Sequence, residues 1–327
     1  MKFSISSCAL ALALTWAGPA AAQDTTLKFG HAAASSHLFQ TGLEMFAEKV
    51  AEKTGGKVKI EVYGDRQLGD DKQLLEGLQL ATIDGALVSA PLLPLVIGAG
   101  AFDAVQLPFL VGSYDEMASL LAGEPGQALL DSLDAKNIKG LGYIEAGQRH
   151  FLSRDKEVKT VDDFAGLKTR IVPTPLFKAT WEAVGTNPVG LAYGEVYSAL
   201  ETGTIDAVEI NLSSIQSESL YQAGKNVTLT GHYFWPGVLM MGSGFASLPE
   251  DVQQAMVEAG HEVIAEQYAM AAEQEGETKT FLSENGVTVS ELSDLDAMRE
   301  KMAPVLTEWS TRDPLIEQFI AAAKSGS

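Results

Sequence analysis

Residues 57–90 read KVKIEVYGDRQLGDDKQLLEGLQLATIDGALVSA and contain a strand, a helix and a second strand in that order. Polar and apolar residues alternate over Lys57–Tyr63, the period of two that is typical of a strand. Asp70–Leu80 has helical spacing, with acidic residues in the first turn where the helix dipole favours them. Ile83–Ala90 is a short apolar run that predicts a third element, a buried strand. This order predicts a mostly parallel sheet covered by helices.

The rest of the chain extends the same alternation. Before this stretch, Thr26–Gly30 (TLKFG) predicts a strand and His37–Lys53 a helix that ends at Gly55-Gly56. After it, the pattern recurs with strands at Gly140–Ile144, Leu167–Val172 and Ala207–Ile210, a short helical turn at Val161–Phe164, and helices at Pro175–Val184 and Tyr193–Thr202. The chain is too long for one ordinary core. We therefore predict the α/β class with two lobes in series, joined by a hinge, with a ligand at the strand ends between them.

A long segment without internal proline, Pro249–Glu284, predicts a helix that crosses both lobes. At 1.5 Å per residue it would extend about 50 Å, which exceeds one lobe. Gly260 and Gly276 are the expected bend points. We expect a signal peptide at 1–22, a first lobe of 23–146 plus 236–275, and a second lobe of 147–235 plus 276–327.

The N-terminus has the features of a secretory signal. Lys2 precedes an apolar stretch from Cys8 to Ala17, which is shorter than the roughly 20 residues that span a bilayer. Ala20 and Ala22 fit the small-residue cleavage pattern, so cleavage after Ala22 and a periplasmic location are expected. Cys8 is the only cysteine and would leave with the signal, so the mature chain would have no disulfide and no thiol nucleophile.

The chain is strongly acidic, with 23 Lys and Arg against 43 Asp and Glu and a formal net charge of −20. This charge argues against nucleic acid or anionic lipid as a partner. The uncharged segment Gly85–Phe102 contains Pro91 and Pro94, so we predict a buried strand followed by a loop there, and no membrane span in the mature chain.

Enzyme motifs are incomplete. A dinucleotide fingerprint that begins at Gly98 has Asp103 in place of its third glycine, and a zinc-protease helix that begins at His261 has Ala265 in place of its second histidine. The five histidines show no metal-ligand spacing. The sequence therefore predicts a protein that is not an enzyme, with no cofactor and no metal site.

Two arginines stand in or just beyond predicted strands. Arg170 lies inside Leu167–Val172, and Arg149 follows the strand Gly140–Ile144. A planar guanidinium can hold a carboxylate with two parallel hydrogen bonds. The residues alone leave two interpretations open: a clamp for a ligand carboxylate, or an internal salt bridge to one of the many acids.

Several motifs in fixed order resemble a known family, the solute-binding components of tripartite ATP-independent periplasmic (TRAP) transporters. This group includes receptors for C4-dicarboxylates, sialic acid and uronates. The resemblance covers essentially the whole mature chain and rests on LKFGH (Leu27–His31), QLGDD (Gln67–Asp71), DFAGLKTR (Asp163–Arg170), AYGEVYSALETG (Ala192–Gly203), DAVEIN (Asp206–Asn211) and LPED (Leu248–Asp251).

The resemblance implies two α/β lobes, a hinge and a long helix that crosses both. It also implies a role in ligand binding for Arg170, which would clamp the carboxylate, for a second arginine, Arg149, and for Asn211 and the aromatic Tyr193. From the first lobe, His31 and Asp71 would reach the ligand. Two positions depart from the pattern: Leu212 follows Asn211 where many relatives have proline, and Ser89 stands where sialic acid receptors have an acid.

The sequence defines the ligand class less narrowly than it defines the family. The stretches Ser213–Ser219 and Tyr193–Tyr197 resemble the uronate-binding relatives, so a sugar acid is expected. A C4-dicarboxylate or another monocarboxylate is the alternative, as is a periplasmic sensor or enzyme on the same fold. Trp235 either stacks on the sugar or packs in the core, whereas Trp181 is expected in the core. The expected partners are the organic acid and the small and large membrane subunits of a TRAP transporter, with a monomeric receptor.

Overall fold

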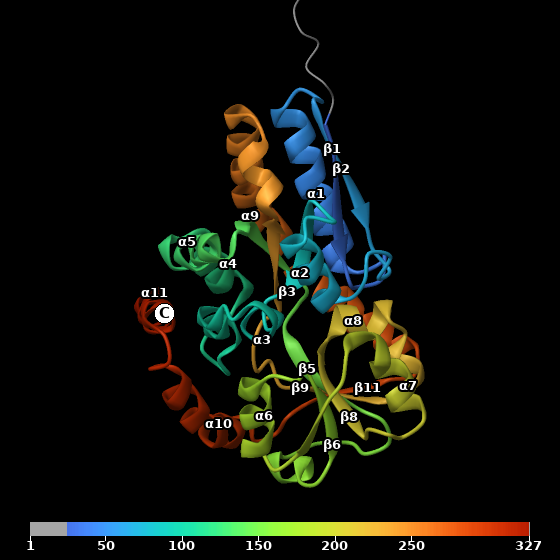
Figure 1. Cartoon of the computed structure of the whole chain (residues 1–327). Helices are drawn as coiled ribbons and strands as arrows, with labels where there is room; N and C mark the ends of the chain where they lie inside the picture. The colour runs from blue at the N-terminus through green and yellow to red at the C-terminus, as the bar shows by residue number, and fades with distance from the viewer. Residues whose placement is uncertain (1–24, 327) are drawn as a thin grey trace, which may run out of the picture.

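Two mixed β-sheets organise the computed structural model, which describes residues 25–326, and each sheet is the centre of one lobe (Figure 1). The expected signal peptide and its cleavage site lie outside these residues. The first sheet has the order β2-β1-β3-β10-β4, formed by β1 (Thr25–His31), β2 (Val58–Tyr63), β3 (Gly85–Ser89), β4 (Lys139–Glu145) and β10 (Pro236–Met241). The second has the order β11-β9-β5-β8-β6-β7, formed by β5 (Arg149–Ser153), β6 (Lys168–Ile171), β7 (Asn187–Gly190), β8 (Ala207–Asn211), β9 (Asn226–Leu229) and β11 (Thr288–Glu291).

Both sheets are mostly parallel, as expected, and each contains one strand that runs against the others. In the first, β1 pairs parallel with β2 and β3, but β10 is antiparallel to β3 and β4. In the second, β6 is parallel to β7 and β8, and β9 to β11, but β5 is antiparallel to β8 and β9. The antiparallel strands, β10 and β5, each follow directly after a strand of the other sheet, β9 and β4 respectively. The local pattern of strands and helices in the sequence does not show where the chain passes from one sheet to the other.

The first two helices of the first lobe begin at residues whose side chains cap them. The side chain of His37 accepts from the backbone N–H of Phe39 at the start of α1 (Leu38–Lys53). Asp70 and Gln73 form a reciprocal capping box at the start of α2 (Asp71–Gln79). These helices are the crossovers between β1, β2 and β3, as the sequence predicts.

The segment after β3 is helical, and the prediction of a loop there was wrong. It forms α3 (Leu92–Ile97) and a 3-10 helix, η1 (Gly100–Gln106). Pro91 precedes the helix and Pro94 falls in its first turn, where no intrahelical N–H bond is lost. The helices α4 (Tyr114–Ala122) and α5 (Glu124–Asp131) and a 3-10 helix, η2 (Ser132–Lys136), follow.

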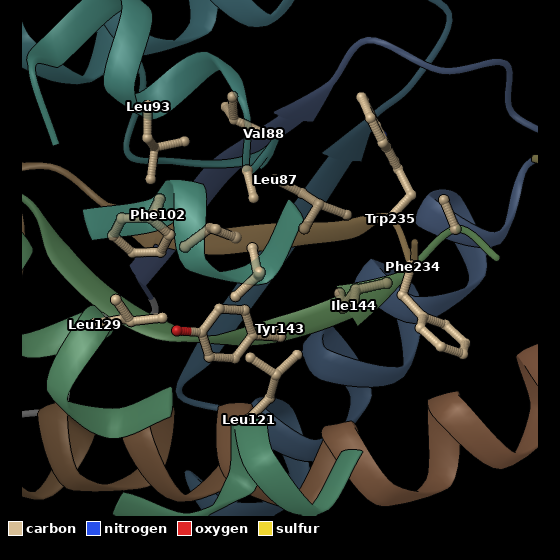
Figure 2. Packing of buried hydrophobic residues seen from close by; sticks show 14 of the residues in the cluster. Leu87, Val88, Leu93, Phe102, Leu121, Leu129, Tyr143, Ile144, Phe234 and Trp235 are labelled. Atoms are coloured by element: carbon tan, nitrogen blue, oxygen red, sulfur yellow. The ribbon is translucent and has the colours of Figure 1, made fainter. Parts of the chain in front are cut away.

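The core of the first lobe packs around the central strands. Tyr143 of β4 is fully buried among Leu121, Leu129 and Phe102, and its hydroxyl donates to the carbonyl of Gly126 at 2.8 Å (Figure 2). Just before β10, Phe234 and Trp235 point to opposite sides of the chain (Figure 2).

The second lobe carries shorter helices and turns around its sheet: α6 (Pro175–Ala183), α7 (Val196–Glu201), α8 (Leu212–Ser217), and the 3-10 helices η3 (Val161–Phe164), η4 (Tyr193–Glu195) and η5 (Leu220–Gln222). Trp181 of α6 is fully buried and stacks on Phe151, so it is a core residue as expected.

Three of the connections that cross between the lobes meet at the hinge: the turn from β4 to β5, the segment from β9 to β10, and α9 (Glu250–Glu284). The first two are hydrogen-bonded to each other, Ala146 N–H to the Trp235 carbonyl at 3.1 Å and Arg149 N–H to the Tyr233 carbonyl at 2.8 Å. The buried Glu145 carboxylate accepts from the backbone N–H of Gly147 and of Trp235, both at 2.8 Å.

The third connection is tied to the same residue. Gln267 of α9 accepts from the Glu145 N–H at 2.7 Å and donates to its carbonyl at 2.8 Å. Glu145 therefore joins all three crossings into one bonded unit at the hinge.

The helix α9 is continuous through both expected bend points. Gly260 packs directly on β4, where an added Cβ would lie 2.0 Å from the Leu141 carbonyl oxygen, while an added Cβ at Gly276 would meet nothing within 4 Å. Gly260 is thus a site of close helix–sheet contact. None of the helices in residues 25–326 is both long and apolar enough to cross a membrane.

The C-terminal helices divide between the lobes. After a 3-10 helix, η6 (Ser243–Ser247), and α9, α10 (Leu295–Trp309) packs on α6 of the second lobe, whereas α11 (Pro314–Gly326) returns to α4, α5 and η1 of the first. The sequence-based division places 276–327 in the second lobe as a block.

Candidate ligand-binding site

A cavity of about 590 Å³ lies between the lobes, a size suited to a small organic molecule. The first lobe lines it with residues such as Ala33, His37, Asp71 and Ser89, and the second with Arg149, Arg170, Leu191, Tyr193 and Ser214. Of the seven residues predicted for the site, Arg149, Arg170, Tyr193, Asp71 and Trp235 line this cavity. His31 and Asn211 are not among the residues that line it.

Arg170 is a buried cation, and no carboxylate of residues 25–326 lies within salt-bridge distance of it. It lies in β6, its side chain is 3% exposed, and its Nε and one terminal nitrogen donate to the Leu191 carbonyl at 3.1 and 2.9 Å. Within residues 25–326 it makes no ion pair. Burial, together with the charge of Arg149, lowers its pKa to about 10, although Glu209 opposes the shift.

Arg149 is the opposite case. Its guanidinium pairs with the Glu209 carboxylate at 2.7 and 2.8 Å, and also contacts the Asn211 side-chain oxygen at 3.3 Å. Trp235 covers it, with the guanidinium carbon 3.7 Å from the ring centroid. The internal salt bridge that the sequence left open therefore exists for Arg149 and not for Arg170.

The buried charged groups around Arg149 and Arg170 in the second lobe sum to one positive charge. Burial alone would raise the pKa of Glu209, but the charge of Arg149 and contact with His232 outweigh it, so the pKa lies below its usual value. Burial lowers the pKa of His232 to about 4, which leaves that ring neutral near pH 7. Two arginines thus face one ionised carboxylate, and one further negative charge would neutralise the cluster.

Asn211 positions other groups rather than lining the cavity. Its amide nitrogen donates to the Ala146 carbonyl at 2.7 Å, and its oxygen accepts from Arg149 and from the Ser214 hydroxyl. Tyr193 does line the cavity, and its hydroxyl donates to Ser214 at 2.9 Å.

His37 is a lining residue that the sequence analysis missed. Its Nδ1 accepts from the Phe39 N–H, so Nε2 carries the proton and reaches Ser214 and Ser213 of the second lobe at 3.1 and 3.2 Å. Burial lowers its pKa to about 3, so the ring is neutral. The sequence signal was present, because a histidine directly before the helix Leu38–Lys53 occupies its N-cap position. His31, the predicted residue, instead bonds Gln40 at 2.7 Å.

The first lobe brings acceptors to the cavity. Burial raises the pKa of Asp71 to about 6, with the neighbouring Asp70 adding to the shift and hydrogen bonding from Ser89 opposing it. The hydroxyl of Ser89 also accepts from the Trp235 indole at 3.3 Å. Trp235 is 6% exposed, so it both lines the cavity and packs in the core.

Comparisons with known proteins agree on one family. The sequence pattern of the bacterial extracellular solute-binding proteins, family 7, matches residues 29–312. The C4-dicarboxylate-binding periplasmic protein of Rhodobacter capsulatus is 31% identical, over 98% of this chain and 96% of its own.

Two solved structures are close to this one. The sugar acid binding protein of Advenella mimigardefordensis in complex with galactonate is 28% identical with a TM-score of 0.87, covering 93% of this chain and 99% of its own. A TRAP periplasmic solute binding protein of Sulfitobacter sp. NAS-14.1 with bound β-D-galacturonate is 31% identical with a TM-score of 0.84, covering 92% and 100%.

Proposed function

Because this chain belongs to the bacterial extracellular solute-binding proteins of family 7, the receptors of TRAP transporters, we propose that it binds a sugar acid with a single carboxylate, a uronate or an aldonate. The ligand occupies the cavity between the lobes, and the receptor delivers it to the membrane subunits of the transporter.

The observation that carries the proposal is the buried charge of Arg170, which makes no ion pair within residues 25–326 and shares the single Glu209 carboxylate with Arg149. A buried cation without a counter-charge is costly, and removing that cost favours an anionic ligand. The remaining donors of the guanidinium match a carboxylate in two parallel hydrogen bonds. Arg149 adds its charge from beside Trp235, held by Glu209 and Asn211.

The first lobe supports a polyhydroxylated ligand. Asp71 and Ser89 can accept hydrogen bonds from sugar hydroxyls, and Tyr193 and Trp235 offer aromatic surface to a sugar ring. A second carboxylate would instead meet the charge of Asp71, which disfavours a C4-dicarboxylate. Galactonate and galacturonate in the two structural neighbours have the favoured chemistry.

The proposal extends to compartment and partners. Proteins of this family are periplasmic receptors. The mature chain starts after Ala22, acts as a monomer, and meets one small and one large membrane subunit. His31 bonds Gln40 and does not line the cavity, so its contribution to binding is indirect. The two lobes divide near the crossings at Ala146 and Trp235.

Thermal unfolding of protein that has been unfolded and refolded, to remove carried-over ligand, tests the function. A ligand at 100 times its dissociation constant adds about 2.7 kcal/mol of stability. We expect galactonate, galacturonate or glucuronate to raise Tm, with little effect of glucose or succinate. Equal shifts from glucose and glucuronate would contradict the carboxylate clamp, and a shift from succinate alone would favour the dicarboxylate alternative.

A further inference from the structure

Glu218 joins the two lobes at a point outside the cavity wall. It follows α8 in the second lobe, and its two carboxylate oxygens bind two different donors of the first. One oxygen accepts from the backbone N–H of Ala34 at 3.0 Å, and the other accepts from the guanidinium of Arg66, also at 3.0 Å. Both side chains are partly buried, with 28% of Arg66 and 16% of Glu218 exposed.

Arg66 makes a second contact across the lobes. Its guanidinium carbon lies 5.0 Å from the centre of the Tyr193 ring, within the range of a cation–π interaction. Tyr193 lines the cavity, whereas neither Arg66 nor Glu218 is among the residues that line it. The pair can therefore affect the ligand through the position of the lobes and of Tyr193, without touching the ligand itself.

The backbone on both sides of this contact is strained. Asp65 and Arg66 have φ of +53° and +59°, and Ser219 has φ of +55°, a region that residues with a Cβ rarely adopt. Local bonds hold the first-lobe turn: Asp65 donates its N–H to the Ala33 carbonyl at 2.8 Å and accepts from the Ser35 N–H at 2.9 Å. Strain of this kind persists where the surroundings determine the geometry, and it clusters at ligand clamps and switches.

We propose that Arg66, Glu218 and the Ala34 N–H form an interlobe clasp that stabilises the closed form of the receptor. Opening the lobes separates Glu218 from both of its first-lobe donors, so the clasp contributes only to the closed form. Apparent ligand affinity is the intrinsic affinity multiplied by the fraction of receptor that is closed. The clasp therefore tunes affinity and the lifetime of the bound state. This inference rests on the proposed function for the ligand used to test it.

Three variants separate the parts of the clasp. Glu218→Gln removes the charge and keeps an oxygen for the Ala34 N–H, Glu218→Ala removes both, and Arg66→Met keeps an apolar stem against Tyr193. Glu182→Gln is the matched control, because Glu182 pairs with Lys178 within one helix of one lobe. None of these three positions, Glu218, Arg66 and Glu182, lines the cavity.

The first measurement is binding of galactonate and glucuronate. We expect Glu218→Ala and Arg66→Met to weaken affinity about three- to ten-fold, mostly through faster dissociation, because the bond lost is one partly exposed ion pair with its backbone contact. The affinity of Glu218→Gln should lie between the affinities of those two variants and that of the parent. The affinity of Glu182→Gln should equal that of the parent. The double variant Arg66→Met/Glu218→Ala should lose less than the product of the two single losses.

The second measurement needs no ligand. Spin labels at Lys57→Cys in the first lobe and Glu201→Cys in the second are expected to be the only thiol-borne labels, since Cys8 precedes the expected cleavage site. Pulsed EPR should show a larger open population in Glu218→Ala than in the parent. An unchanged distance distribution, or parent-like affinity in both Glu218→Ala and Arg66→Met, would overturn the clasp.

The two proposals fail in different ways. If no sugar acid stabilises the parent protein, the proposed function fails, and the EPR comparison still decides the clasp. Lower thermal stability in the variants with unchanged affinity and distances would assign the pair to fold stability alone and would overturn its role in closure.

Discussion

Arg170 and Arg149 are equally buried, but among the carboxylates of residues 25–326 one forms a salt bridge with Arg149 and none does so with Arg170. This difference gives Arg149 a structural ion pair and leaves the charge of Arg170 free to pair with a ligand. Since both arginines looked alike in the sequence, the distinction belongs to the arrangement of β5, β6 and β8.

The first prediction concerns the shape of the Arg170 group. Arg170→Lys keeps the charge but loses the planar fork, so sugar acid affinity should fall about 10- to 100-fold, because a hydrogen bond to a charged group contributes about 1.5–3 kcal/mol. Calorimetry on the folded variant measures it, with the exposed Arg299→Lys as the control. Unchanged affinity in Arg170→Lys would remove this residue from the site.

The second prediction concerns the pH dependence of Asp71. Its pKa is raised from 3.8 to about 6 by burial, so the folded protein resists ionising this carboxyl. A group with a raised folded-state pKa contributes stability below its unfolded pKa and loses that contribution as the pH rises through its folded pKa. The ligand-free protein should therefore lose about 1–2 kcal/mol between pH 4 and pH 7 through this residue.

Asp71→Asn removes this titration. Urea unfolding of the parent and the variant should show the variant gaining relative stability between pH 4 and pH 7, while its affinity for sugar acids decreases at pH 7. A stability difference that is constant across this range would mean that Asp71 does not titrate there.

The long helix α9 is the element whose glycines have opposite environments. Gly260 is buried against β4, where a Cβ would meet the backbone of Leu141, and Gly276 is exposed on the same helix. By sequence alone, both glycines weaken a helix to the same extent. Their packing in the folded protein distinguishes them.

The third prediction uses this pair. Gly260→Ala should destabilise the protein by about 1–3 kcal/mol, because the helix must move away from the sheet. Gly276→Ala should stabilise it by about 0.5–1 kcal/mol, because alanine loses less entropy in a helix. Equilibrium urea denaturation gives both values, and equal effects of the two substitutions would contradict the close contact at Gly260.

For the whole molecule, the site has two walls on two lobes, joined at a hinge that Glu145 and Gln267 hold together. His37 reaches Ser213 and Ser214 across the cavity, and Glu218 reaches Arg66 outside it. Contacts of this kind form together only when the lobes approach, so a ligand held by both walls favours the closed form.

The fourth prediction is ligand-driven closure. Small-angle scattering should show a smaller radius of gyration with saturating galactonate or glucuronate, and no change with glucose. Since α9 runs along both lobes, closure should also bend it. A bound sugar acid that leaves the scattering profile unchanged would mean that the transporter recognises the loaded receptor by another feature.

The sequence by itself determined the elements that depend on local pattern. Strands such as β2 and helices such as α2 and α9 follow from the spacing of apolar residues and from caps within a few positions. The ordered motifs identified the family. The resemblance to that family in turn implied ligand-binding roles for Arg170, Arg149 and Tyr193. The sequence predicts a loop where α3 forms after β3, because Pro91 and Pro94 would break the interior of a helix. Proline is tolerated, however, in the first turn of a helix.

Only the tertiary structure decided what depends on residues far apart in the chain. It paired Arg149 with Glu209, placed Arg170 out of salt-bridge distance of every carboxylate in residues 25–326, and set His37 rather than His31 on the cavity wall. It also inserted β10 antiparallel into the first sheet and β5 antiparallel into the second. The charge state of a buried group depends on every neighbour within a few ångströms, and those neighbours come together only when the chain crosses between its lobes.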